Sequence, residues 1–224
     1  MPCILIVGAS RGIGFELATQ YRADGWEVIG TARDDAGLAR LAGIGAQSLR
    51  LEATDPAAPA ALAQRTAALA LDIGFVNAGV YGPRTPGLEP PSDEDFAAVM
   101  RTNVMAPMRL APALAPALAR GKGKLAVTSS RMGSIAARTA VAGWLYRASK
   151  AALNSALKDM SLVLGPQGIT CVSFHPGWVR TDMGGSGADI PVTESVAGMR
   201  RTLATLSAAQ NGSFLNYDGS PIPW

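Results

Sequence analysis

Short apolar segments alternate with longer helical patterns along this chain, and this alternation limits the folds available to it. Most of the short segments are continuously apolar, as expected for strands covered by helices on both faces. The sequence predicts strands at residues 3–7, 27–31, 47–51, 73–77, 124–128, 170–174 and 213–216. It predicts helices near residues 12–23, 57–70, 93–119, 145–164 and 193–207. Such alternation indicates an α/β fold: a single-domain Rossmann-type, doubly wound parallel sheet of about seven strands with helices on both faces.

Three prolines lie inside the third helical segment, at Pro107, Pro112 and Pro116. Proline lacks the backbone N–H and its ring collides with the preceding turn of a helix. The sequence therefore predicts that a helix over residues 93–119 is kinked or ends early.

Length and composition fit one globular domain over residues 1–224. The net charge is only +3 and no dense basic run occurs, which argues against a nucleic-acid partner. No apolar run reaches the length of about 18 residues that spans a membrane, so no membrane partner is expected. Cys3 and Cys171 lie in apolar segments, which favours free thiols in a reducing compartment. These features predict a cytoplasmic protein.

A glycine-rich turn follows the first predicted strand, with Gly8, Gly12 and Gly14 leading into an amphipathic helix. Glycines at these positions allow a tight turn and a close approach of the backbone to a pyrophosphate at the helix N-terminus. An ordinary turn is the alternative. The strand before it and the helix after it favour a cofactor site.

Tyr146 and Lys150 lie four residues apart in a helical pattern, on the same helical face. Together with Gly-x-x-x-Gly-x-Gly near the N-terminus, this Tyr-x-x-x-Lys spacing resembles the short-chain dehydrogenase/reductase family. The tail FLNYDGSPIPW and the segments SSRMGSI and PGWVRTDM are most similar to its C-factor/sniffer-like carbonyl reductase branch. The resemblance covers almost the whole chain.

The resemblance implies a catalytic set. Tyr146 would be the general acid/base, Lys150 would lower the pKa of the phenol and hold the nicotinamide ribose, and Asn103 would complete a proton relay. A serine would orient the substrate carbonyl. The second serine of the Ser129–Ser130 pair fits best, yet it lies sixteen residues before Tyr146, where the family pattern has thirteen. Either the loop carries a three-residue insertion or Ser134 takes this role, and we favour Ser130.

The resemblance also implies a set of coenzyme contacts. These are Gly8, Ser10, Arg11, Gly12, Ile13, Gly14, Arg33, Glu52, Ala53, Asn77, Ala78, Gly79, Tyr146, Lys150, Pro176, Gly177, Val179 and Thr181. The chain departs from the family pattern at Val7, where the family has threonine, at Glu52, where it has aspartate, and at Val76, where it has asparagine. Glu52 reaches further than aspartate would.

The end of the second predicted strand should select the coenzyme. An acid there would accept hydrogen bonds from the adenosine ribose diol, whereas an arginine favours a 2′-phosphate. The acid position of the family falls on Ala32, and Arg33 follows it. Arg11 resembles the basic residue of NADP-preferring members. The sequence therefore predicts NADP(H).

The expected function is that of an oxidoreductase that transfers a hydride between NADP(H) and a small carbonyl or alcohol substrate. The alternative is a nucleotide-binding signalling protein of C-factor type with incidental catalysis. The resemblance allows a homodimer or a homotetramer, and leaves the substrate open. The only histidine, His175, is interpreted as structural, and no metal site is expected. Met132, Trp144, Trp178 and Met183 are candidates for an apolar substrate wall, with core packing as an equal alternative.

Overall fold

A computed structural model describes residues 1–185 and 187–224. Its seven strands form one sheet in the order β3-β2-β1-β4-β5-β6-β7, and every neighbouring pair is parallel. The strands are β1 (Cys3–Val7), β2 (Glu27–Ala32), β3 (Gln47–Arg50), β4 (Ile73–Val76), β5 (Lys124–Thr128), β6 (Thr170–His175) and β7 (Ser213–Asn216). The predicted parallel α/β sheet is confirmed, and the strand ends differ from the prediction by at most one residue.

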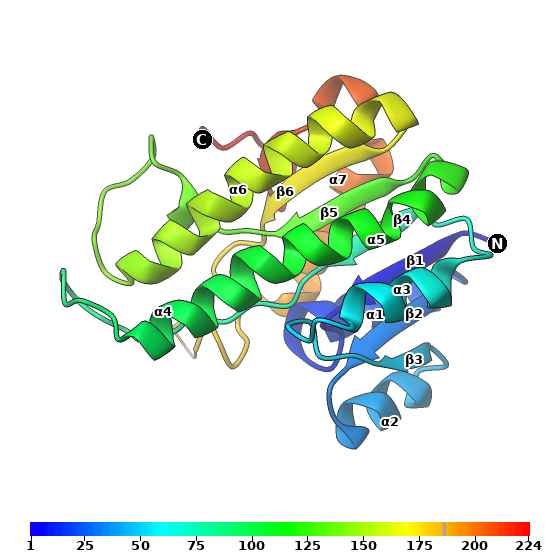
Figure 1. The fold of residues 1–224 in the computed structure, drawn as a ribbon, viewed down its shortest axis with the longest axis horizontal. Helices are drawn as coiled ribbons and strands as arrows, with labels where there is room; N and C mark the ends of the chain where they lie inside the picture. The colour runs from blue at the N-terminus through cyan, green and yellow to red at the C-terminus, as the bar shows by residue number, and fades with distance from the viewer. Residues whose placement is uncertain (186) are drawn as a thin grey trace.

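Helices cover both faces of this sheet (Figure 1). They are α1 (Gly12–Ala23), α2 (Asp35–Gly43), α3 (Ala58–Thr66), α4 (Asp93–Met100), α5 (Ala106–Gly121), α6 (Trp144–Leu164) and α7 (Val192–Thr205). Alternate side chains of β1 pack on opposite faces of the sheet. Leu5 packs in the core formed with α3, α5 and α6, and Ile6 packs in the core formed with α1 and α7. This period of two explains why β1 is apolar throughout.

The strand order reverses between β1 and β4, at the centre of the sheet. Val7 and Val76 are the last paired residues of these two strands. The segments that begin at Gly8 and Asn77 therefore leave the sheet side by side at its carboxyl edge. Open α/β sheets bind ligands in the crevice at such a reversal.

The helix α2 is the one long element that the sequence did not predict. Its segment is short and contains Gly37 and Gly43, which weaken a helical pattern. The fold stabilises it through Asp34, whose side chain accepts a hydrogen bond from the Gly37 amide at 2.7 Å.

The proline-rich helix does not end early. It continues as α5 to Gly121, and its irregularity is a π-helical turn, η1 (Arg101–Met105), immediately before Ala106 and Pro107. A π turn shifts the hydrogen-bonding pattern by one residue and is common at functional sites. Leu110, Leu114 and Leu118 are fully buried in the core, and this packing holds the helix despite Pro112 and Pro116.

Cys3 and Cys171 are free thiols, as predicted, and both are buried. None of the described helices is long and apolar enough to cross a membrane.

Candidate active site

The glycine turn occupies the crevice between the ends of β1 and β4. Gly8 and Gly12 have φ values of +81° and +54°, a backbone conformation that residues with a Cβ rarely adopt. A Cβ on Gly14 would lie 2.1 Å from the Gly8 carbonyl oxygen. The three glycines of the sequence motif are therefore required by the backbone geometry of this turn.

Side chains from neighbouring strands hold the turn in place. The Gly8 amide donates to Thr31 Oγ1 at 2.9 Å, and Asn77 Nδ2 donates to the Gly8 carbonyl at 2.9 Å. Thr128 Oγ1 in turn donates to Asn77 Oδ1 at 2.9 Å. Val7, where the family pattern has threonine, is buried in the core. A hydroxyl from β2 anchors the turn, and no motif pointed to Thr31.

The start of α1 fits a pyrophosphate. Arg11 is the N-cap residue in an extended conformation, and among the described residues no side chain caps this helix end. The first turn of α1 contains no acidic residue. Its backbone N–H groups and its positive dipole end are therefore available to an anion.

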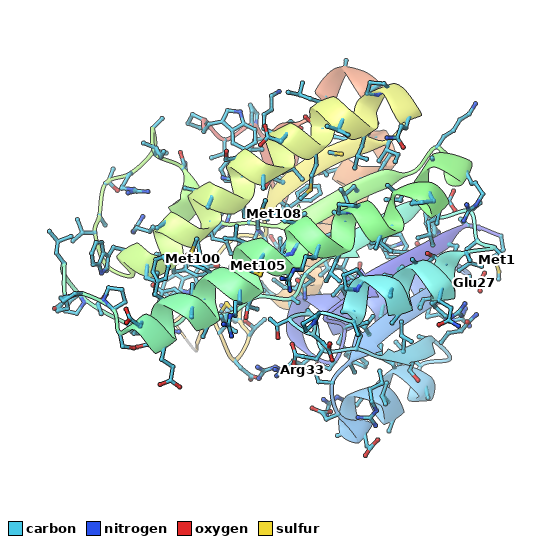
Figure 2. The ribbon with its side chains drawn as sticks, in the orientation of Figure 1. Met1, Glu27, Arg33, Met100, Met105 and Met108 are labelled. Carbon is cyan, nitrogen blue, oxygen red and sulfur yellow. The ribbon has the colours of Figure 1, made fainter. Side chains whose placement is uncertain are left out.

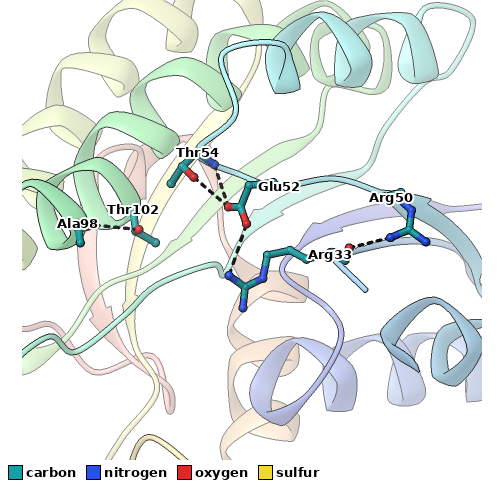
Figure 3. A network of polar contacts seen from close by, with 6 residues as sticks. All are labelled: Arg33, Arg50, Glu52, Thr54, Ala98 and Thr102. Atoms are coloured by element: carbon teal, nitrogen blue, oxygen red, sulfur yellow. Dashed lines mark hydrogen bonds and ion pairs between the residues drawn. The ribbon is translucent and has the colours of Figure 1, made fainter. Parts of the chain in front are cut away.

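Arg33 follows the last residue of β2 and lies beside Glu52 (Figure 3). Arg33 Nη1 and Glu52 Oε2 are 3.4 Å apart, and the Arg33 side chain is 69% exposed. Burial acts to raise the pKa of Glu52, but hydrogen bonds from the Thr54 amide and hydroxyl and the charge of Arg33 outweigh it and lower that pKa. Glu52 therefore stays ionised beside Arg33.

Two further arginines flank Ser10. Arg11 Nη1 lies 2.6 Å from Asp182 Oδ2, in the loop after β6. Arg40 Nε donates to the Ser10 carbonyl at 2.9 Å. The sequence missed Arg40 because it lies on the unpredicted helix α2. A Cβ on Gly37 would lie 2.8 Å from the Cβ atoms of both Ala32 and Ser10, so the end of β2 and the glycine turn meet here.

Tyr146 and Lys150 lie one turn apart on α6, and both are buried. Lys150 Nζ donates to the Thr128 carbonyl at 2.7 Å and lies 5.6 Å from the centroid of the Tyr146 ring. The Ser130 side chain lies close enough to the Tyr146 phenol to lower its pKa. It also accepts from the Met132 amide at 3.1 Å, which fixes it at the start of a short 3₁₀ turn. The fold thus brings Ser130, Tyr146 and Lys150 together at the end of β5.

Ser134 lies elsewhere. It is fully buried, and its hydroxyl donates to the Pro223 carbonyl at 2.6 Å and accepts from the Ala137 amide at 3.0 Å. These bonds attach the C-terminal segment to the loop after η2 (Arg131–Gly133).

Asn103 lies in the π turn and is fully buried. Its Oδ1 accepts from the Val80 amide at 2.9 Å, and its Nδ2 donates to the Val80 carbonyl at 2.8 Å and to Ser149 Oγ at 2.9 Å. A Cβ on Gly79 would lie 3.3 Å from Asn103 Oδ1 and 3.5 Å from Lys150 Nζ. Asn103 therefore links the loop after β4 to α6, next to the lysine.

Burial has the largest effect on the pKa values of Tyr146 and Lys150. It raises the pKa of Tyr146 well above its usual value, and the nearby Ser130 side chain offsets this increase only in part. Burial lowers the pKa of Lys150 to about 8. This direction for Tyr146 is opposite to the lowering that the sequence predicts, because the cost of burying a phenolate outweighs the favourable contacts. In the protein alone, the phenol holds its proton.

The loop after β6 returns to the glycine turn. Gly177 has a φ of +88°, and Ser195 Oγ on α7 donates to the Pro176 carbonyl at 2.5 Å. Val179 pairs with Ile190. A Cβ on Gly12 would lie 3.4 Å from Thr181 Cγ2, which places Thr181 directly over the start of α1.

Of the four candidates for an apolar wall, two are exposed. Trp178 is 53% exposed and Met183 is 40% exposed. The core-packing interpretation is therefore wrong for these two. Trp144 Nε1 donates to the Glu89 carbonyl at 3.0 Å, so this ring has a fixed position at the start of α6.

Comparison with known proteins decides the family. The model of the short chain dehydrogenase family matches residues 2–189. The chain belongs to this family. A putative short-chain dehydrogenase/reductase from Burkholderia multivorans, solved with bound NADP, is 36% identical with a TM-score of 0.89, and the match covers 100% of this chain and 99% of that one. The NADPH-bound carbonyl reductase from chicken fatty liver is 33% identical with a TM-score of 0.91, over 100% and 99% of the two chains.

Among curated proteins, this short-chain dehydrogenase is similar to the C-signal of Myxococcus xanthus. The two are 42% identical over 158 residues, which are 69% of this chain and 93% of that protein. The carbonyl reductase Sniffer of D. melanogaster is 32% identical with a TM-score of 0.88 and full coverage of both chains. These relatives confirm the predicted resemblance to the C-factor/sniffer-like branch.

His175 is the last residue of β6. Burial, with a smaller effect of the Arg131 charge, lowers the pKa of its imidazole to about 4. In the described residues no group of three or more His, Cys, Asp and Glu side chains could hold a metal ion.

We expect His175 to make the protein less stable as the pH falls from about 6.5 to about 4. In this range the unfolded chain binds a proton that the folded imidazole does not, so the free energy of unfolding decreases, by up to about 3 kcal/mol. Urea unfolding at pH 7 and pH 5 measures this loss, and the variant His175→Gln should show less of it. Since the chain has one histidine, its NMR titration reports the pKa directly. An imidazole that titrates near 6.5 would contradict the assignment.

Proposed function

We propose that this chain is one domain over residues 1–224 that acts as an NADP(H)-dependent carbonyl reductase or alcohol dehydrogenase. The observation that carries the proposal is that the side chains of Ser130, Tyr146 and Lys150 meet at the end of β5, beside the glycine turn. These groups form a proton donor, a positioning hydroxyl and a cation beside a pyrophosphate cradle.

The chemistry follows from this arrangement. When bound, the coenzyme supplies or accepts the hydride at the carbonyl carbon. Ser130 would donate a hydrogen bond to the substrate oxygen and hold it against Tyr146. Tyr146, whose phenol retains its proton in the protein alone, would donate that proton to the oxygen as it gains charge. In the oxidation direction the phenolate would accept it, and the Lys150 ammonium would favour the phenolate.

Several contacts support NADP(H) as the coenzyme. Arg33 presents an exposed guanidinium at the end of β2, next to the buried methyl group of Ala32. Arg11 and Arg40 add two positive charges at Ser10. The solved relatives with bound NADP and NADPH have the same fold. All the coenzyme contacts predicted from the sequence, those at Ile13, Ala53, Ala78 and Val179 included, stay predictions.

The test of the proposed function is NADPH consumption with a panel of aldehydes, ketones and diketones. We expect turnover with NADPH for at least one class. Failure of all of them, with coenzyme bound, would favour the second candidate, a nucleotide-binding signalling protein. That candidate is supported by the 42% identity to the C-signal.

The serine assignment has its own test. Ser130→Ala should lower turnover by about tenfold or more, because a hydrogen bond to a developing negative charge is lost. Ser134→Ala should change turnover little and lower the melting temperature, because its hydroxyl binds Pro223 and Ala137. Steady-state kinetics and thermal unfolding of both variants distinguish the two serines. The reverse ranking in turnover would show that Ser134 is the catalytic serine.

A homodimer or homotetramer is part of the proposal. Met105 and Met108 are 42% and 52% exposed along the outer side of η1 and α5, in line with Met100 (Figure 2). Phe96 on α4 is 50% exposed. Sedimentation velocity measures the oligomeric state.

A further inference from the structure

An aromatic ring that no motif singled out lies on the proposed catalytic tyrosine. The rings of Tyr81 and Tyr146 are stacked, with centroids 4.6 Å apart and an interplanar angle of 20°. Tyr81 belongs to the loop after β4, and its hydroxyl lies against Gly143, where a Cβ would be 2.4 Å away. Tyr81 thus lies between the loop after β4 and the start of α6, and it forms one wall beside the Tyr146 phenol.

Arg84 covers this wall. Its Cζ lies 4.6 Å from the centroid of the Tyr81 ring. Since Tyr146 occupies one face of Tyr81, the guanidinium must lie on the other face. Arg84 Nη2 also donates to the Met183 carbonyl at 2.7 Å, in the loop after β6. The guanidinium therefore has two contacts, one with the loop after β4 and one with the loop after β6, rather than being free to move as an exposed arginine usually is.

The Arg84 guanidinium has more N–H donors than its bond to Met183 requires. An arginine has five N–H donors, and the bond to Met183 uses one. No carboxylate of the described residues pairs with Arg84, whereas Arg11, Arg33, Arg50 and Arg200 each have one. Glu89, on the same loop, accepts from the Gly87 amide instead.

Two further charged side chains lie on the segments next to Tyr146 and Arg84. Arg131 follows Ser130 directly and its charge reaches His175 at the end of β6. The acid nearest to Met183 in the sequence is Asp182, which is paired with Arg11. A planar guanidinium without a carboxylate partner among the described residues therefore lies against the Tyr81–Tyr146 stack.

We propose that Arg84, held on Tyr81, selects carbonyl substrates that carry a carboxylate a few bonds from the reacting carbonyl. A guanidinium binds a carboxylate through two parallel hydrogen bonds, and the Tyr81–Tyr146 stack sets its position relative to the catalytic phenol. This inference rests on the proposed function and names the substrate class of the same site.

The test compares a carboxylate substrate with its neutral analogue. NADPH consumption is measured with 3-formylbenzoate and with its methyl ester, for the unaltered protein and for Arg84→Met. We expect Arg84→Met to lower the ratio of kcat/KM for the acid to that for the ester by about tenfold, because a charge-assisted bond is lost. Arg84→Lys, which keeps the charge without the planar donors, should restore the ratio in part.

Arg201→Met is the matched control, because Arg201 is an exposed arginine on α7 without a carboxylate partner in the described residues. Its acid-to-ester ratio should equal that of the unaltered protein. An equal loss for acid and ester in Arg84→Met, or no change in the ratio, would overturn the proposal.

Failure of the proposed function gives a different result, namely no turnover of either aldehyde. Calorimetric titration of benzoate in the presence of NADP then decides the inference without turnover. Binding that weakens about tenfold in Arg84→Met supports it, and binding that is absent or equal in the two proteins contradicts it.

Discussion

Tyr146→Phe should lower turnover by at least about a hundredfold while NADP(H) still binds. The substitution removes the transferable proton and leaves the ring stacked on Tyr81. Loss of general acid–base catalysis costs about 10²- to 10⁴-fold. The measurement is steady-state NADPH consumption, with coenzyme affinity determined separately by fluorescence titration.

Tyr21→Phe is the matched control. Tyr21 is also a buried tyrosine beside a cation, since the Arg200 guanidinium lies 4.5 Å from its ring centroid, and burial raises the pKa of its phenol to about 12. It lies on α1 with its ring in the core. We expect its turnover to match that of the unaltered protein. Unchanged turnover in Tyr146→Phe would rule out the proposed acid.

Coenzyme preference should be at least about tenfold in favour of NADP(H), a difference of about 1.4 kcal/mol. A 2′-phosphate carries a charge of roughly −1.5 to −2, and the exposed Arg33 guanidinium can meet it with paired donors. NAD(H) has no phosphate for these donors. Ala32 offers no carboxylate to its ribose hydroxyls.

Ala32→Asp should reverse this preference, which amounts to a change of about a hundredfold in the ratio of the two dissociation constants. The new carboxylate accepts hydrogen bonds from the ribose diol and repels the phosphate. Titration of both coenzymes at one salt concentration measures the ratio. The melting temperature serves as a control, because Ala32 is buried and packs near Gly37. Tighter binding of NAD(H) by the unaltered protein would contradict the assignment.

The sequence by itself determined the features that depend on local patterns. Continuous apolar runs located most of the seven strands, because strands covered on both faces have no polar side. The spacing of Tyr146 and Lys150 placed both on one helical face, because helix geometry sets that relation over four residues. The three glycines marked a turn whose backbone geometry requires them.

Only the tertiary structure decided which distant groups meet. The sequence does not distinguish the roles of Ser130 and Ser134. In the structure Ser130 lies against Tyr146, whereas Ser134 binds the C-terminal segment. Thr31 anchors the glycine turn from another strand. Helix α2, with Arg40, forms because Asp34 caps it and Leu41 is buried against the sheet, which outweighs its weak helical propensity.

The dependence on distant contacts also explains why the sequence predicted a lowered pKa for Tyr146. The nearby lysine can be recognised from spacing, but burial depends on the whole fold and raises the pKa instead. The stack of Arg84, Tyr81 and Tyr146 likewise joins a loop after β4 to a helix that begins some sixty residues later. Local patterns determine elements and motifs, whereas packing between residues far apart in the chain determines burial, charge and the shape of the site.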